Sequence, residues 1–266
     1  MSAVQRIFLG AIAAVGAVTV AIATVRDLRA GPSDPSSGMS LGFDGTFSGT
    51  TLDGSTWGTC YSWFASTSGC TNFGNTIQDV WYLPSWDVVS GGVLRLVATA
   101  TPTRGFTESG SSKTYPYSSG MVTTRKSFDF TYGYVQVVAR IPGGSGTWPA
   151  LWLLPKRKGW PPEIDIMENW GSAHQIQTTF IWSSAGTVEQ AHETASSSSS
   201  LSTGYHTYGL LWEPGSLTWY LDGKVVDTYT GNHVPRQPMY FLANLAIDGA
   251  ARSGGSFSIR SVRIYQ

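Results

Sequence analysis

Short strand-forming segments separated by turn residues constrain the fold of this chain more than any other feature. Residues 217–221 and 224–226 are rich in strand formers and flank Asp222-Gly223. Asp-Gly supplies the positive φ angles of a two-residue turn, so this stretch predicts a β-hairpin. Further strand-like segments lie at 92–98, 132–140, 238–247 and 257–265. Few windows beyond the N-terminal segment have helical periodicity, so we predict an all-β sandwich or jelly roll.

The N-terminal segment indicates export. Arg6 precedes an uncharged apolar stretch from Ile7 to Val25, and Ala21-Ile22-Ala23 offers a small-residue cleavage site. The stretch is also close to the length that spans a bilayer, so an uncleaved anchor stays open. We expect a secreted protein, which would contact a membrane only if this segment is retained. The chain then divides into three predicted parts: a signal peptide or anchor at 1–29, a Pro/Gly/Ser-rich linker at 30–40 and one domain at 41–266.

The composition argues against a nucleic-acid partner. Lys+Arg and Asp+Glu both number 17, so the formal net charge is zero and no basic face for nucleic acid is expected. Charged residues make up only 13%, whereas the chain has 31 Gly and 11 Trp. Such a balance favours a surface that meets neutral polymers.

The two cysteines predict a disulfide. Cys60 and Cys70 are an even count in a chain with an export signal, so a local Cys60–Cys70 bridge is expected. With no further Cys and only four His, a cysteine-rich zinc site is excluded. We predict no metal site and no cofactor.

The run EIDIME at 163–168 holds the strongest functional signal. On a strand, Glu163 and Asp165 share one face, and a β-bulge at Ile166-Met167 would bring Glu168 to the same face. Three crowded acids repel one another and raise at least one pKa, which suggests function rather than stability. Two carboxylates about 5–5.5 Å apart can cleave a glycosidic bond with retention. By spacing alone, a solvated strand face or metal-binding carboxylates remain equally open.

The sequence around these acids resembles glycoside hydrolase family 16, whose bulged motif is E-[ILV]-D-[IFV]-x-E. The acids follow GTWPALWLLP at 146–155 and WPP at 160–162. Other segments occur in the family's order: YSSG at 117–120, FTYGY at 130–134, HTYGLLW at 206–212, WYLDG at 219–223 and NLA at 244–246. The resemblance covers most of residues 41–266.

The resemblance implies a β-jelly roll of two curved antiparallel sheets with a sugar cleft on the concave face. It implies that Glu163 is the nucleophile, Glu168 the general acid/base and Asp165 an assisting acid. The bulge is more similar to the laminarinase side of the family. The domain at 41–266 would then be a monomeric, retaining endo-glycosidase that hydrolyses β-1,3 or mixed β-1,3/1,4 glucan through a covalent glycosyl-enzyme intermediate.

Aromatic residues near the motif are candidates for sugar binding, because sugar C–H faces stack on aromatic rings. The alternative for each is packing in the core. The predicted substrate-binding residues are Trp148, Trp152, Trp170, Trp81 and Asn244.

Two departures from the family pattern bear on substrate and metal. Laminarin-cutting relatives commonly have His in the strand after the acids, where this chain has Gln177 and Ile181. Many relatives contribute an Asp from the last strand to a calcium site, where this chain has Arg260, which repels the ion. Three alternatives stay open: a galactan-active hydrolase of the agarase or carrageenase kind, a cell-wall transglycosylase, and a non-catalytic lectin-like glycan binder.

Overall fold

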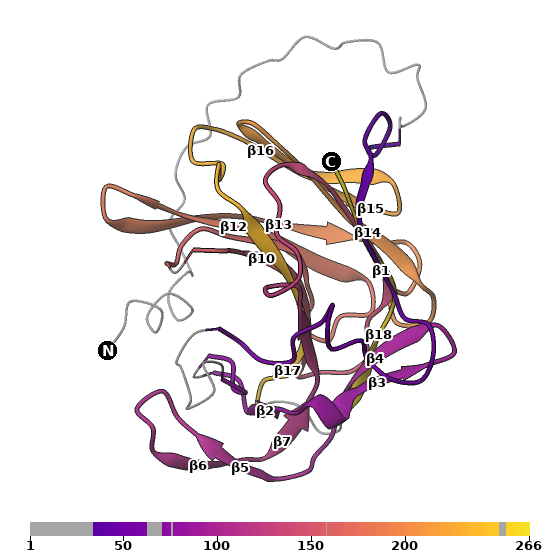
Figure 1. The fold of residues 1–266 in the computed structure, drawn as a ribbon, viewed down its shortest axis with the longest axis vertical. Helices are drawn as coiled ribbons and strands as arrows, with labels where there is room; N and C mark the ends of the chain where they lie inside the picture. The colour runs from indigo at the N-terminus through magenta and orange to yellow at the C-terminus, as the bar shows by residue number, and fades with distance from the viewer. Residues whose placement is uncertain (1–33, 63–70, 76, 158, 250–253) are drawn as a thin grey trace. The chain divides into compact units, whose positions relative to one another are not determined.

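The computed structural model describes residues 34–62, 71–75, 77–157, 159–249 and 254–266 (Figure 1). The predicted signal or anchor at 1–29 and Cys70 lie outside these residues, so both predictions stay open. Within the described part, no helix is long and apolar enough to cross a membrane.

The first large sheet is antiparallel and eight-stranded, in the order β16-β15-β14-β9-β18-β4-β3, with β1 also paired to β18. Its strands are β1 (Leu41–Thr46), β3 (Asp87–Ser90), β4 (Val93–Ala98), β9 (Gly133–Arg140), β14 (His206–Glu213), β15 (Ser216–Leu221), β16 (Lys224–Thr230) and β18 (Gly255–Tyr265).

The second large sheet is antiparallel and six-stranded, in the order β13-β12-β11-β10-β17-β8. Its strands are β8 (Met121–Thr123), β10 (Thr147–Pro155), β11 (Glu163–Glu168), β12 (Gln175–Ser184), β13 (Thr187–Ser196) and β17 (Met239–Ile247). The smaller elements are β2 (Val80–Tyr82), β5 (Thr103–Phe106), β6 (Ser112–Tyr115), β7 (Tyr117–Ser119) and the 3-10 turn η2 (Pro84–Trp86).

The core lies between the two large sheets and follows from the period-2 alternation of their strands. On β9 the buried residues Val135, Val137 and Ala139 face this core. Leu151 and Leu153 of β10 do the same from the second sheet. The sequence therefore folds as an all-β sandwich of two antiparallel sheets, as predicted.

The predicted hairpin is present as β15 and β16. Asp222 and Gly223 form its turn with φ of 52° and 75°, a conformation that Gly reaches without steric cost and Asp tolerates. The strand-like segments that the sequence identifies correspond to β4, β9, β17 and β18. The hairpin places Trp219 in the core, fully buried, where it reaches the second sheet.

Candidate active site

A β-bulge on β11 brings the three acids to one face. In the pairing with β10, Trp152 lies opposite Asp165 and Leu151 opposite Met167, so the register shifts by one residue between them. The same shift separates Asp165 and Glu168 in the pairing with β12. The bulge falls at Ile166-Met167, as the motif predicts.

The opposite face of β11 anchors the bulge in the core. Ile164, Ile166 and Met167 are all buried there. The indole N–H of Trp219, from the first sheet, donates to the backbone carbonyl of Asp165 over 2.9 Å. A bulge interrupts the ladder of backbone hydrogen bonds, and this bond from the other sheet satisfies a carbonyl beside it.

Two further indoles donate to the carboxylates themselves. Trp160 Nε1 lies 2.6 Å from Glu163 Oε2. Trp148 Nε1 lies 2.8 Å from Glu168 Oε1. Asp165 is 4% exposed and Glu168 8% exposed, so both are taken almost wholly out of bulk water. Each outer glutamate of the run therefore has its own N–H donor.

Burial raises the pKa of each of the three acids above its ordinary value. For Asp165 the negative charges of Glu168 and Glu163 raise the pKa further. A hydrogen bond shared by Glu163 and Asp165 lowers the pKa of Glu163 and raises that of Asp165. Hydrogen bonds with Trp160 and Asp165 thus lower the pKa of Glu163, whereas a hydrogen bond with Trp148 lowers that of Glu168. This arrangement favours the ionised form of Glu163 and the protonated form of Glu168.

Asn244 on β17, the strand next to β10, orients the predicted sugar-binding residue Trp152. The indole of Trp152 donates to Asn244 Oδ1 over 2.8 Å, and Asn244 Nδ2 donates to the hydroxyl of Tyr82 over 3.2 Å. Tyr82 in turn donates to Gln78 over 2.9 Å. Asn244 is buried, whereas Trp152 is half-buried. The polar atoms of Asn244 are thus occupied in holding Trp152 on the face that carries Asp165.

Trp148 and Trp170 form an aromatic pair beside Glu168. Their ring centroids are 5.6 Å apart with a tilt of 35°. Trp148 is only 4% exposed, whereas Trp170 is 42% exposed. Trp170 therefore offers the open ring face of this pair, and Trp148 supports it from beneath.

Trp81 lies in a different surrounding from the other predicted tryptophans. It packs against Phe73 and Tyr115 at centroid distances of 6.1 and 5.3 Å, and its ring lies against Gly105 of the β5–β6 hairpin. Its neighbour Tyr82 points the other way and reaches Asn244. The described ring contacts of Trp81 are thus with Phe73 and with the β5–β6 hairpin, and its sugar-binding role stays a prediction.

Three residues to which the sequence gave no role, Trp160, Tyr61 and His192, lie at or next to this face. Trp160 contacts Glu163 through the hydrogen bond given above, and Tyr61 lies 6.1 Å from the Trp152 ring. Tyr82 completes the Asn244 network. His192 on β13 pairs with Thr179, which itself pairs with Asp165. The register also places Gln177 opposite Glu168 and Ile181 opposite Glu163. An acidic motif alone gives no signal for partners from other strands.

Arg260 stands at the position where the family resemblance places a calcium-binding Asp. Arg260 stacks over the ring of Tyr205, with the guanidinium carbon 3.7 Å from the centroid. A guanidinium supplies no oxygen ligand, so this residue does not fit a calcium site. Among the described residues, no group of three or more His, Cys, Asp or Glu side chains is arranged to hold a metal ion.

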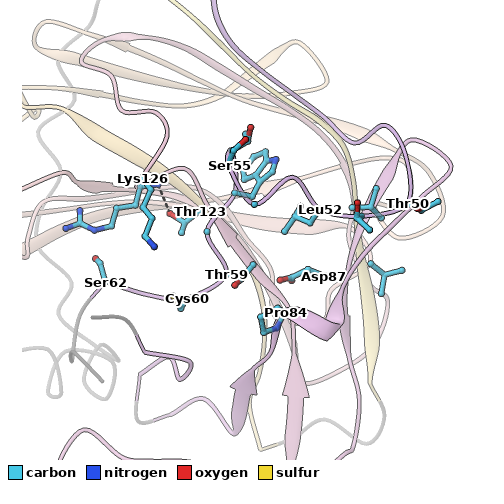
Figure 2. A pocket seen from close by; sticks show the side chains of 18 residues that line it. Thr50, Leu52, Ser55, Thr59, Cys60, Ser62, Pro84, Asp87, Thr123 and Lys126 are labelled. Atoms are coloured by element: carbon cyan, nitrogen blue, oxygen red, sulfur yellow. Dashed lines mark hydrogen bonds between the residues drawn. The ribbon is translucent and has the colours of Figure 1, made fainter. Parts of the chain in front are cut away.

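A cavity of about 710 Å³ lies apart from the acids, lined by residues of the segments 50–62, 84–89 and 123–126 (Figure 2). Its lining includes Asp87 and none of the three acids of β11. Asp87 is 8% exposed, and among the described residues no group makes a hydrogen bond of good geometry to either of its carboxyl oxygens. Burial raises the pKa of Asp87 to about 8, and the nearby backbone N–H of Met121 offsets part of this rise.

The family follows from a direct match. Residues 90–259 match the family described as Glycosyl hydrolases family 16. The chain belongs to this family. The bulged strand, its three acids and the sandwich of two sheets are the family 16 features that the sequence predicted.

The sequence is also similar to individual glycanases. The chain is 36% identical over 205 residues to the endo-1,3-1,4-beta-glycanase ExsH of Rhizobium meliloti (strain 1021), covering 71% of this chain and 42% of ExsH. It is 35% identical over 201 residues to the endo-1,3-1,4-beta-glycanase EglC of the same strain, with the same coverage. The chain thus spans less than half the length of each of these two relatives.

A solved structure gives the same fold. LamA from Z. galactanivorans, in complex with laminaritriose and laminaritetraose, superposes with a TM-score of 0.72 at 26% identity. The match covers 85% of this chain and 98% of that one.

Proposed function

We propose that the domain is a retaining endo-glycosidase that hydrolyses β-1,3 or mixed β-1,3/1,4 glucan. The observation that carries the proposal is the acid face of β11, where Glu163 and Glu168 each accept an indole N–H and flank the buried Asp165. The R. meliloti relatives are endo-1,3-1,4-beta-glycanases by name, and the LamA structure holds laminarin-type oligosaccharides, which favours a β-glucan substrate.

The reaction proceeds by double displacement. Ionised Glu163 attacks the anomeric carbon, and protonated Glu168 gives its proton to the departing glycosidic oxygen. A glycosyl ester on Glu163 results. Glu168, now ionised, takes a proton from water, which attacks the same carbon and releases Glu163. Asp165 holds a proton toward Glu163 and so limits the charge on the cluster before and after the attack.

Aromatic side chains on the same face supply the glucan contacts. Trp170 presents its open ring, and Trp152 is fixed by Asn244. Flat apolar faces with few charges suit neutral sugar rings, whose axial C–H groups stack on them. Binding energy from such remote contacts positions the scissile bond over the carboxylates.

The test compares reducing-sugar release from laminarin, lichenan and agarose by wild type and by Glu163→Gln. Glu193→Gln is the matched control, because Glu193 is an exposed acid on β13 that pairs with Thr178, one residue before the acid-face position Thr179. We expect wild type and the control to release sugar from laminarin and lichenan, and Glu163→Gln to lose this activity.

Release from agarose alone would contradict the glucan assignment while leaving the hydrolytic mechanism standing. Glycan binding with no release from any of the three polymers would contradict the hydrolase assignment and favour the lectin-like alternative. Longer products in place of new reducing ends would favour the transglycosylase.

We also propose that the domain acts outside the cytoplasm, because an apolar segment at 7–25 and a small-residue site at 21–23 precede it. Mass spectrometry of the protein recovered from culture medium tests this. A mature N-terminus shortly after residue 23 is expected, and full-length protein confined to the cytoplasm would contradict the proposal.

A further inference from the structure

We propose that Trp160 and Trp148 are positioning residues that each orient one catalytic carboxylate, Glu163 or Glu168, and favour its ionised form through the indole N–H group. This inference rests on the proposed function and adds to it two residues that each hold one of the two carboxylates in place.

The geometry separates these indoles from sugar platforms. The edge of each indole, through Nε1, is directed at a carboxylate oxygen, at 2.6 Å for Trp160 and 2.8 Å for Trp148. Trp148 is 4% exposed and covered in part by Trp170, so its broad face is not open to a ligand. Trp160 lies in the segment that enters β11 and packs against the core cluster, which fixes its N–H toward Glu163.

The chemistry of the indole makes these contacts directional. An indole N–H donates and cannot accept a hydrogen bond, so it stabilises a carboxylate and gives nothing to a proton on the same oxygen. Trp148 occupies Glu168 Oε1, and the proton that Glu168 delivers is therefore carried on Oε2. Trp160 occupies Glu163 Oε2 and leaves Oε1 for attack or for the Asp165 proton.

The two glutamates differ in the number of donors. Glu163 is stabilised as an anion by Trp160 and by Asp165, whereas the stabilising donor of Glu168 is Trp148. Glu168 is buried and Glu163 is half-buried, and hydrogen bonds to charged groups are stronger in such surroundings than in water. Removing one N–H should therefore raise the pKa of the glutamate that it contacts more than that of the other.

The experiment is a ¹³C NMR titration of glutamate carboxyl carbons in wild type, Trp160→Phe and Trp148→Phe. Glu163→Gln and Glu168→Gln assign the two resonances. Phe keeps an aromatic ring and deletes the N–H. Trp152→Phe is the matched control, because its indole lies on the same face but donates to Asn244. This measurement needs no turnover, so it succeeds or fails independently of the proposed function.

We expect Trp160→Phe to raise the pKa of Glu163 by about one pH unit or more, with a smaller change at Glu168. Trp148→Phe should do the reverse, and Trp152→Phe should move neither. In the hydrolysis assay, the acidic limb of kcat/KM should move to higher pH in Trp160→Phe, and the basic limb should do so in Trp148→Phe.

Unchanged titrations in the two variants, or equal movement of both glutamates in each, would overturn the inference even if glucan hydrolysis is confirmed. Trp160 is half-buried in a loop, so its variant provides the test should the buried Trp148→Phe fail to fold. A lower kcat with unmoved titrations would mean that the indoles only support the local packing.

Discussion

Two regions of this protein bury acidic side chains, and they do so in opposite ways. On β11 three acids lie together, and both outer members accept an indole N–H. On β3 Asp87 lies in the wall of a cavity, and within the described residues only the nearby backbone N–H of Met121 favours its charged form. Burial raises the pKa in both places. A raised pKa by itself therefore does not distinguish a catalytic acid from an isolated one.

The surroundings make the distinction. The β11 acids have donors that favour the charged form, a neighbouring acid that shares a proton, and an open aromatic ring nearby in Trp170. Asp87 has a core-facing position next to Val89 and close backbone contact from Gly120. The surroundings of the β11 acids support the repeated loss and gain of a proton, whereas those of Asp87 disfavour its charged form.

Replacing the acids should separate the two regions by activity. Glu168→Gln should lower kcat by about 1,000-fold or more, because no group remains to protonate the leaving oxygen. Asp87→Asn should leave kcat within about twofold of wild type, since its removal touches no group of the acid face. Steady-state hydrolysis of lichenan measures both. Comparable losses in the two variants would break the distinction.

Asp87→Asn should change the stability of the folded protein in a pH-dependent way. The pKa of Asp87 is about 8 in the folded protein and about 3.9 in an unfolded chain. Between these values the unfolded chain has released a proton that the folded chain retains, so the Asp87 contribution to stability falls as pH rises from about 4 to 8. The variant should be more stable than wild type by about 1–3 kcal/mol at pH 8.

Urea unfolding of Asp87→Asn at pH 4 and pH 8 measures this difference. The gap between variant and wild type should be large at pH 8 and small at pH 4. An equal gap at both values, or a less stable variant at pH 8, would show that Asp87 is paired in the folded protein.

Trp219→Phe tests how the bulge is held. The variant leaves the backbone carbonyl of Asp165 unpaired in the core, and it should cost about 1–2 kcal/mol of unfolding free energy. Trp212→Phe is a suitable control, since it removes a similarly buried indole N–H from the carbonyl of Pro235. Chemical unfolding gives both costs. Only Trp219→Phe should also lower kcat, because only it borders the acids.

Trp170→Ala gives the smallest effect. Loss of one exposed stacking platform should raise KM by about 2- to 10-fold with little change in kcat. Kinetics on laminarin oligosaccharides of increasing length measure it. A fall in kcat with KM unchanged would place Trp170 in the chemistry instead.

The sequence predicts those parts of the structure that depend on local pattern. Asp222-Gly223 predicts its hairpin, and the spacing of Glu163, Asp165 and Glu168 predicts the bulge because one register slip is the simplest way to align them. The resemblance extends this to the two-sheet fold.

Partners from distant strands could not be predicted in this way. Trp219 reaches the bulge from 54 residues away, and Asn244 meets Tyr82 across 162 residues. Trp148 was predicted as a sugar contact, but neither its burial nor the direction of its N–H is encoded in its spacing from the acids. Asp87 stands in an ordinary strand pattern, which gives no sign of its missing partners.

The stereochemistry of the first product distinguishes a double displacement on Glu163 from a single displacement by water. ¹H NMR during early hydrolysis of laminarin or lichenan, before mutarotation, identifies the anomer that is released. Retention predicts the β-anomer first, followed by slow appearance of the α-anomer. Initial release of the α-anomer would contradict a covalent intermediate on Glu163 and would assign the carboxylates to a single displacement by water.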